Sequence, residues 1–478
     1  MAPKIMFART LINQLKTQSL KYVPFADAAS HDLPIGKLLR LSLFQAVIGM
    51  ITSLLVGTLN RVMIVELSMP AFWVALAFAI PLVFAPLRAL IGYRSDTHPS
   101  ALGLKRIPYL WIGTLLLFGG LSIMPFALLL LSDPPPNTEW LGRFGVTLAF
   151  ILVGFGMQVT QTAGLALASD LSTHEKRPRV VALLYSMLLI GMIGSSILYG
   201  VFLSDFTPTH LIQVIQGSAV VVVVFNLMSL WKQEARSHRR GPREDKGFQK
   251  NWYRLMQQAS MRRFLWTVAL GTAAFSMQDI ILEPFGAEVL GLNVSTTSSL
   301  TALSAGGSLL AFFLSSVWLG KSVDAYRLAS AGVLLGLPAF ACVIFSAPLD
   351  SALLFRIGTF LIGFSGGLFS VGMLVTAMSF NNEKYAGMVM GAWGAVQATA
   401  SGLAMAAGGF LRDLIAGLAT SGALGSSLDS PATAYSFVYH IEIYMLFVVL
   451  IALGPLVRNN RQSEKNEANH FGLAEFPS

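Results

Sequence analysis

The chain has 478 residues, of which 54% are hydrophobic and only 12% are charged, and its formal net charge is +9. This composition, with its positive mean hydropathy, excludes a soluble domain of this size and predicts an integral membrane protein. The single cysteine, Cys342, excludes an intramolecular disulfide and any cysteine-based metal or redox motif.

The first 40 residues lack the compact apolar core of a secretory signal, because lysine and arginine interrupt their isolated apolar residues. We therefore expect residues 1–40 to form an amphipathic segment that rests on the cytoplasmic surface of a membrane.

Apolar runs of about 20 residues, the length that crosses a bilayer core, recur along the rest of the chain. They predict an all-α membrane protein with twelve transmembrane helices in two six-helix bundles. The N-terminal bundle covers 41–231 and the C-terminal bundle covers 264–457. The predicted spans lie near 41–59, 71–92, 107–131, 144–168, 180–203, 211–231, 264–287, 297–319, 328–348, 352–379, 387–415 and 436–457.

The segment 232–263 between the bundles carries a large excess of Lys and Arg over Asp and Glu. Further basic clusters follow spans two, four, eight and twelve, and such clusters favour the cytoplasmic side of a membrane. Both termini are therefore predicted to be cytoplasmic, including a tail at 458–478. Because the linker joins two spans and has no nucleic-acid-binding fold, we expect it to contact anionic lipid headgroups and no nucleic acid.

The connection between the second and third spans has a Gly-x-x-x-Asp motif at 92–96 and a Gly-x-Lys-Arg motif at 103–106. With a few inserted residues, it resembles the signature of the major facilitator superfamily, and 320–324 repeats the first motif after span eight. Glycine permits close helix approach, and a carboxylate is favourable at a helix start. A cytoplasmic latch between the bundles is therefore predicted, either opening during alternating access or purely structural. Its residues are Gly92, Asp96, Arg106, Gly320 and Asp324.

Four longer motifs narrow this resemblance. They are YVPFADAASHDLPIGKLLRLSLFQ at 22–45, LNRVMIVEL at 59–67, YRSDTHPSALGLKRIPY at 93–109 and MQDIILEPFGAEVLG at 277–291. Together they resemble the PucC/LhaA group, the bacteriochlorophyll-delivery family of phototrophic bacteria, over nearly the whole chain. The resemblance implies an assembly factor that helps to insert bacteriochlorophyll and antenna polypeptides into a light-harvesting complex, and we lean toward the core antenna LH1 over the peripheral LH2.

The same resemblance implies bacteriochlorophyll as the cofactor, bound stably or transiently. The implied partners are light-harvesting antenna polypeptides, the reaction centre and pigment-synthesis enzymes. The implied location is the bacterial inner membrane, in its intracytoplasmic photosynthetic form, with a multi-pass topology.

Polar side chains inside apolar spans are costly in lipid, so they normally face the bundle interior or a ligand path. Asp279 and Glu283 are four residues apart and would share one helix face, which Pro284 would end or kink. The ordinary interpretation is a helix-breaking turn at the periplasmic rim, and the alternative is contact with a pigment, substrate or partner. For buried amides the ordinary role is an interhelical hydrogen bond. The candidates for pigment or ligand binding are Gln158, Gln161, Gln278, Asp279, Glu283 and Gln397.

The magnesium of a chlorin needs an axial donor, yet all seven histidines fall in loops, in tails or near span ends. We therefore expect no buried axial histidine, and side-chain oxygens, water or a backbone carbonyl stay open as ligands. The sequence shows no nucleotide loop, metal-ligand cluster or activated nucleophile, so no enzyme, catalytic residue or metal site is expected.

A proton-coupled transporter of a small solute is the alternative function, with Asp279 or Glu283 carrying the proton. Spans one and four offer no acid near the middle of the membrane, which weakens this alternative.

Two Gly-x-x-x-Gly motifs, at 363–367 and 387–391, predict close helix packing in spans ten and eleven. We expect packing within the chain, and docking of antenna helices is the alternative use.

Overall fold

A computed structural model describes residues 34–83, 85, 104, 106–132, 139–172, 177–231, 233, 253, 256–321, 323–379, 386–425 and 428–470. These residues form helices and connecting turns, with no strand among them. The elements are α2 (Ile35–Thr52), η2 (Ser53–Leu59), η3 (Val62–Glu66), α3 (Ala71–Val83), α5 (Ile107–Ser132), α6 (Glu139–Leu171), α7 (Arg177–Phe202), α8 (Pro208–Leu230), α10 (Ala259–Ser276), η5 (Met277–Ile280), α11 (Leu282–Glu288), α12 (Val294–Gly320), α13 (Ala325–Ser346), α14 (Ala352–Ser379), α15 (Ala386–Thr420) and α16 (Pro431–His470).

Eleven helical segments in the described part of the chain are long and apolar enough to cross a membrane, and Ala71–Leu82 is a shorter apolar helix. They confirm the predicted all-α, multi-pass membrane fold. Most of the linker at 232–263 and the residues between 86 and 103 lie outside the described residues. The predicted domain boundaries stay predictions.

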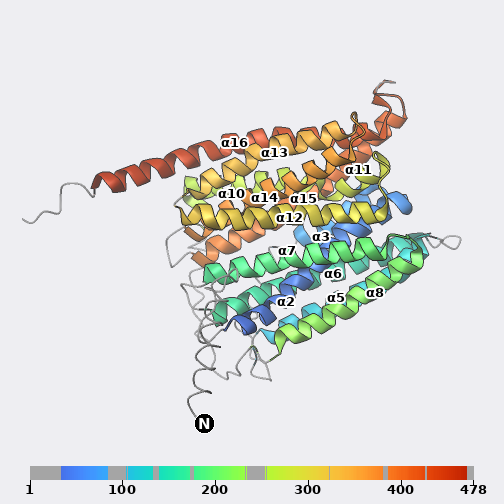
Figure 1. Ribbon diagram of the computed structural model, residues 1–478, viewed down its shortest axis with the longest axis horizontal. Helices are drawn as coiled ribbons and strands as arrows, with labels where there is room; N and C mark the ends of the chain where they lie inside the picture. Colours follow the sequence, from blue (N-terminus) through green and yellow to red (C-terminus); the bar gives the residue numbers. More distant parts are fainter. Residues whose placement is uncertain are drawn as a thin grey trace, which may run out of the picture.

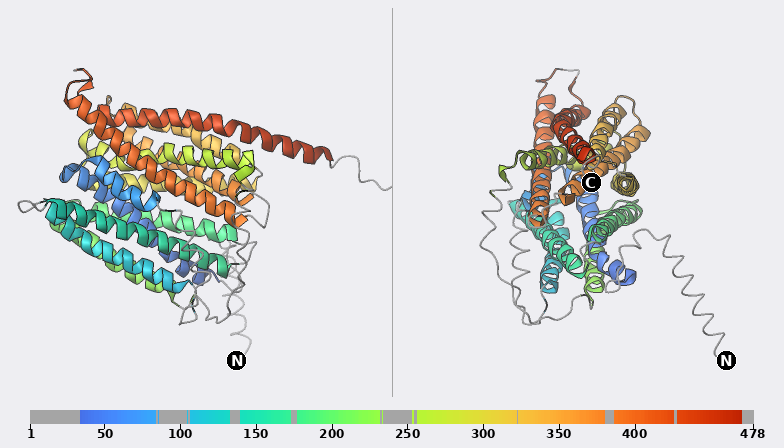
Figure 2. Two further views of the ribbon diagram at one scale, coloured as in Figure 1. Left: turned by 180° about the vertical axis from the view of Figure 1, so that it is seen from behind. Right: turned by 90° about the vertical axis from the view of Figure 1, so that its left-hand side faces the viewer.

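The helices run side by side in two groups (Figures 1 and 2). Within the N-terminal group, α2 packs against α7 and α8, and α5 packs against α6 and α8. Within the C-terminal group, α14 packs against α12 and α13, and α16 packs against α10, α13 and α15. The helix pairs α3–α15 and α7–α12 join the two groups.

The first helix is longer than predicted. It continues through the π-helical segments η2 and η3 to Glu66, so Asn60, Arg61 and Glu66 lie inside it and not between two spans. Arg61 Nη1 donates to Glu66 Oε1 at 2.7 Å, and this spacing of five residues matches the repeat of a π-helix. Asn60 and Arg61 are buried, and polar partners inside the protein satisfy part of their hydrogen-bonding capacity: Asn60 Nδ2 and Arg61 Nη1 are bonded, whereas Asn60 Oδ1 and Arg61 Nε have no partner among the described residues.

The seventh predicted span is broken. The α-helix ends at Ser276, η5 forms a single 3₁₀ turn, and α11 begins at Leu282. The break therefore comes before Pro284, which lies in the first turn of α11, where a missing backbone N–H costs little. Because proline has no N–H and clashes with the carbonyl four residues earlier, here that of Ile280, the position of the break agrees with the predicted effect of Pro284, and Asn60 Nδ2 donates to that carbonyl instead.

The first Gly-x-x-x-Gly motif packs within the chain, as expected. A Cβ atom on Gly363 would lie 2.0 Å from the carbonyl oxygen of Ser304, and one on Gly367 would lie 2.8 Å from Cβ of Ala311, so α14 and α12 approach closely. At Gly391 in the second motif, the structure has nothing within 4 Å of an added Cβ. The prediction of close helix packing is therefore wrong at Gly391.

The last helix also exceeds its predicted end, because α16 continues from Pro431 to His470 without a break. The first part of the predicted tail at 458–478 is thus a helical extension of the twelfth span. Figure 1 shows this extension projecting beyond the ends of the neighbouring helices.

Candidate functional site

A cavity of about 260 Å³ lies between the two halves, beside the break in the seventh span. Its walls come from α7 in the N-terminal half and from α10, η5, α12, α14 and α15 in the C-terminal half. Three of the six predicted candidates, Gln278, Asp279 and Gln397, line this central cavity. The fold therefore brings a polar residue of α15 to the same place as two residues of η5.

The polar wall of the central cavity is built on η5. Gln278 Nε2 donates to Asp279 Oδ1 at 2.7 Å, and the backbone N–H of Gln278 donates to Glu442 Oε1 at 2.6 Å. Glu442 is fully buried on α16 and satisfies a backbone donor at the break in the helix. Our sequence analysis did not single out Glu442, although an acid inside an apolar span is the signal that identified Asp279.

Several buried polar atoms around this cavity have no hydrogen-bond partner among the described residues. They include Oε1 of Gln278, Oε2 of Glu442 and Nε1 of Trp393, and Gln278 and Trp393 line the cavity. Unsatisfied buried donors and acceptors can hold a small polar solute or water. The volume lies below the roughly 300–1,000 Å³ of pockets for drug-sized ligands, so a tetrapyrrole macrocycle does not fit here.

Glu283 does not line the central cavity, although its carboxylate interacts electrostatically with that of Asp279. Its Oε1 accepts a hydrogen bond from Thr301 Oγ1 on α12 at 2.7 Å, and its side chain is buried. Asp279 and Glu283 lie on different elements, η5 and α11, yet their carboxylates are close enough to interact electrostatically, and the predicted shared helix face stays a prediction. A helix-breaking turn is present as expected, but it is buried between the halves and not open at a rim.

Two further hydrogen bonds join the halves next to this turn. Asn60 Nδ2 donates to the carbonyl oxygen of Ile280 at 2.8 Å, and Ser196 Oγ donates to the carbonyl oxygen of Ser298. The first helix and α7 are thereby tied to η5 and α12. These contacts position the break in the seventh span relative to the N-terminal half.

The predicted candidates on α6 lie in the N-terminal half, away from the central cavity. Gln158 Nε2 donates to the carbonyl oxygen of Pro81 on α3 at 3.3 Å, which is the interhelical hydrogen bond expected for a buried amide. Gln161 is half-buried one turn further along α6. Asn226 on α8 likewise donates to Thr114 Oγ1 on α5 at 2.9 Å. A ligand role for Gln158 and Gln161 stays a prediction.

The predicted latch is only partly described, because Gly92 and Asp96 lie outside the described residues. Arg106 Nε donates to Asp170 Oδ2 at 3.0 Å, within the same half. Gly320 ends α12, and Asp324 caps α13 by accepting the backbone N–H of Arg327 at 3.0 Å. A latch between the halves stays a prediction.

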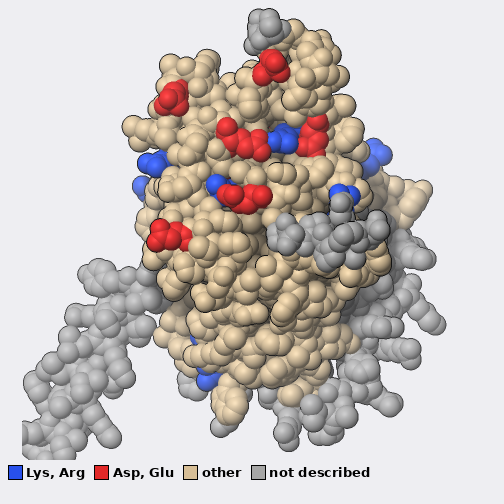
Figure 3. All heavy atoms as spheres, turned by 90° about the vertical axis from the view of Figure 1, so that its right-hand side faces the viewer, with Lys and Arg blue, Asp and Glu red and all other residues tan. Residues whose placement is uncertain are grey.

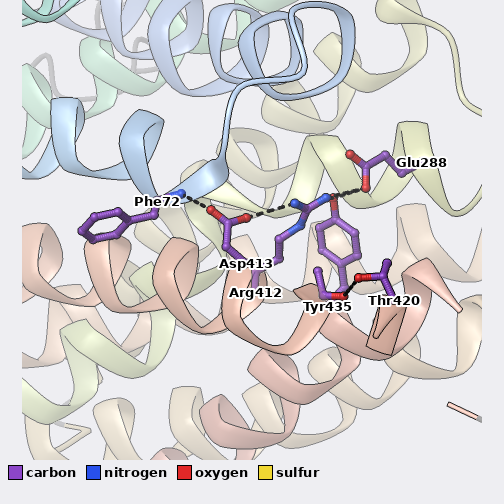
Figure 4. A network of polar contacts seen from close by, with 7 residues as sticks. Phe72, Glu288, Arg412, Asp413, Thr420 and Tyr435 are labelled. Carbon is purple, nitrogen blue, oxygen red and sulfur yellow. Dashed lines mark hydrogen bonds and ion pairs between the residues drawn. The ribbon is translucent and has the colours of Figure 1, made fainter. Parts of the chain in front are cut away.

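A charged network joins the halves at the end of the bundle that lies on the right of Figure 1 and faces the viewer in Figure 3. Arg412 Nη2 donates to Glu288 Oε2 at 2.6 Å, and Arg412 Nη1 donates to Asp413 Oδ1 at 3.0 Å (Figure 4). Asp413 Oδ2 accepts the backbone N–H of Phe72 at the start of α3, at 2.7 Å. Tyr435 Oη also donates to Glu288, at 2.7 Å. The network therefore ties α3 to α11, α15 and α16.

A larger cavity, which we call the outer groove, lies on the N-terminal half between α2, α7 and α8 and has a volume of about 900 Å³. Exposed apolar side chains of α7 flank it, including Leu198, Val201 and Phe202. His210, near the start of α8, lines one end. As expected, His210 lies near a helix end, whereas His440 lies more than two turns inside α16; neither is buried, and His31, His98, His174 and His238 lie outside the described residues.

Residues 58–461 match the family model described as "PUCC protein". The chain is 48% identical to Protein PucC of Rhodovulum sulfidophilum, over 85% of this chain and 92% of that protein. It is also 48% identical to the "Uncharacterized protein in puhA-bchM intergenic region" of Rhodobacter capsulatus, over 99% of this chain and 100% of that protein. A more distant relative, 26% identical over 79% of this chain and 88% of that protein, is the "Bacteriochlorophyll synthase 44.5 kDa chain" of Rhodobacter capsulatus.

Solved structures with a similar fold are membrane transporters. A point mutant of the nucleoside transporter NupG superposes with a TM-score of 0.64 at 15% identity, over 88% of this chain and 99% of that chain. A bacterial homologue of the iron transporter ferroportin in an inward-facing state superposes with a TM-score of 0.65 at 13% identity, over 88% and 98%. These similarities confirm the fold that the Gly-x-x-x-Asp motifs predicted.

Proposed function

We propose that this chain, which belongs to the PUCC family, is a photosynthetic assembly factor that delivers bacteriochlorophyll to light-harvesting complexes during their assembly. The proposal rests on the location and size of the two cavities in the fold. The central cavity of about 260 Å³ is small, whereas the outer groove of about 900 Å³ is flanked by exposed apolar side chains. A groove with such a rim suits a hydrophobic pigment that enters and leaves from the bilayer.

The proposed partners are light-harvesting antenna polypeptides, with the reaction centre and pigment-synthesis enzymes as further candidates. The proposed location is the bacterial inner membrane, with both termini and the basic linker at 232–263 cytoplasmic and facing anionic headgroups. The chain carries a pigment in this proposal and catalyses no reaction.

Between the two antenna types, we favour the core antenna LH1 over the peripheral LH2. The relative named for the puhA-bchM region aligns over 99% of this chain, whereas the relatives named PucC align over 85% to 94%. The wider alignment supports placing this chain with the relative that is not named PucC.

Deleting the gene in a phototrophic host tests the assembly role. The near-infrared absorption of the core antenna should fall several-fold at unchanged growth in the dark, and expression from a plasmid should restore it. Antenna polypeptides should co-purify with a tagged copy of the chain. Normal levels of both antenna types in the deletion strain would contradict the proposal.

A proton-coupled transporter of a small solute is the alternative, and the lining of the central cavity favours it. Gln278, Asp279 and Gln397 meet there between the two halves of a carrier fold, where the size suits a small polar molecule. In this alternative Asp279 carries the proton, because an ionisable group inside a span commonly serves a proton relay.

Asp279→Asn separates the two functions. If the chain delivers a pigment through the outer groove, the variant should keep at least about half of the antenna absorption, because it leaves that groove unchanged. If the chain is a proton-coupled transporter, proton-driven uptake into vesicles should fall about tenfold or more. A strong loss of antenna absorption at a normal level of the variant protein would place the pigment route at the central cavity instead.

A further inference from the structure

We propose that the outer groove binds a magnesium tetrapyrrole, with Nε2 of His210 as the axial ligand of the metal. The inference rests on the proposed function, because it names where the delivered pigment would bind. It also gives a role to His210, which sequence position alone would describe as an ordinary residue near a helix end.

The groove is wide because glycines line it. The first helix packs against both α7 and α8, and the space between those two helices stays open. Gly194 on α7 and Gly217 on α8 both line the groove, and an added Cβ at either position would have no atom within 4 Å. A flat macrocycle could enter between α7 and α8 without displacing a side chain at these two positions.

The imidazole of His210 is held by a backbone carbonyl at the edge of the groove. Its Nδ1 lies 2.8 Å from the carbonyl oxygen of Asp205, in the turn that precedes α8. Since a carbonyl oxygen only accepts, Nδ1 carries the hydrogen, and in the neutral ring Nε2 then holds the lone pair. A bond from the second ring nitrogen to a backbone carbonyl is the usual support of a metal-bound histidine.

The polar groups of the groove are distributed unevenly. Tyr199 and Ser218 lie in its wall, and their hydroxyl oxygens bond each other at 2.9 Å, so neither needs a ligand. Ser204, Asp205, His210 and Gln213 gather at one end. Gln213 lies one turn beyond His210 on α8, so its amide can bond a carbonyl substituent at the edge of a ring.

This pattern fits a magnesium tetrapyrrole better than a phospholipid. The four ring nitrogens of such a pigment leave an axial position of the metal open, which a neutral imidazole at the edge of an apolar slot can fill. The apolar remainder of the groove, flanked by exposed Leu198, Val201 and Phe202, can take the alkyl tail. An acyl chain alone has no use for an oriented imidazole.

The test is a binding titration of the full-length protein in phosphatidylcholine nanodiscs with bacteriochlorophyll a and with its metal-free form, bacteriopheophytin a. Wild type should bind one bacteriochlorophyll with the absorption signature of axially ligated magnesium. His210→Ala should weaken binding of bacteriochlorophyll about tenfold or more and leave binding of the metal-free pigment unchanged, and added imidazole should restore the loss. Retained binding of the metal-free pigment also shows that the variant is folded.

Two matched controls sharpen the result. His440→Ala removes a histidine whose Nδ1 makes the same kind of bond, to the carbonyl oxygen of Ser436 at 2.7 Å, and should leave pigment binding unchanged. Gly217→Leu should weaken binding of both pigments by filling the groove, whereas Gly306→Leu places the same side chain in open space on α12 and should not.

Equal affinity of His210→Ala and wild type for bacteriochlorophyll would overturn the site, as would wild-type binding no greater than partition into empty nanodiscs. If the site fails while the deletion strain still loses its antenna, the assembly role stands and the pigment binds elsewhere. If binding depends on His210 while the deletion strain keeps its antenna, the site stands and the assembly role falls.

Discussion

Arg412→Ala is expected to destabilise the folded protein by about 3 kcal/mol, because it leaves two carboxylates without their cation in a largely buried network. The side chain of Arg412 is 15% exposed, and those of Glu288 and Asp413 are 24% and 22% exposed. Loss of one partner leaves the cost of burying the others uncompensated. Thermal unfolding in detergent should show an apparent melting temperature lowered by several degrees.

Arg412→Ala should also weaken the contact between the two halves of the protein. Asp413 accepts the N–H of Phe72 and so caps the start of α3, where a carboxylate also interacts favourably with the helix dipole. Without Arg412, Asp413 loses the bond that orients it toward α3. The double variant Arg412→Ala, Glu288→Gln should recover part of the lost stability, because it removes one of the two unpaired charges.

Arg356→Ala is the matched control, because Arg356 is exposed at the start of α14 and its loss should cost less than about 0.5 kcal/mol. If Arg412→Ala melts at the same temperature as Arg356→Ala, the network does not stabilise the fold.

Gly307→Ala is expected to destabilise the protein by about 1 to 3 kcal/mol through overpacking. Its new Cβ would lie 2.2 Å from the carbonyl oxygen of Phe360 and 2.8 Å from the backbone nitrogen of Phe364. Both atoms belong to the backbone of α14, so no side chain can rotate away. The two helices would have to separate, and the yield of folded protein in size-exclusion chromatography and its melting temperature should both fall.

The neighbouring glycine provides the control for this prediction. Gly306 lies on the same helix, and nothing lies within 4 Å of a Cβ added there. Alanine is favoured over glycine inside a helix by up to about 1 kcal/mol, so Gly306→Ala should be neutral or stabilising. Equal melting temperatures for Gly306→Ala and Gly307→Ala would show that α12 and α14 do not pack as closely as the structure has them.

The sequence identified which candidate site residues are unusual for a membrane span, but it did not show which residues lie beside them in the fold. Asp279 and Gln278 stand out because a polar side chain inside an apolar span is energetically costly and is normally kept for a structural or functional role. Their companions Gln397 and Glu442 lie on α15 and α16, and only the packing of α10, α15 and α16 brings them together. Sequence spacing predicted that Asp279 and Glu283 lie near each other, but not that the helix changes from η5 to α11 between them.

By itself the sequence determined the class of this protein, because a helix that crosses a bilayer needs about 20 consecutive apolar residues and such runs are visible in the chain. Its motifs also determined the family, since residues 58–461 match the family model. Only the tertiary structure decided that the first helix runs on through Asn60 and Arg61, that Arg412 joins the halves, and that His210 lies in a groove. Each of these depends on which helices become neighbours, and hydropathy along one helix carries no information about the partners that will bury its polar groups.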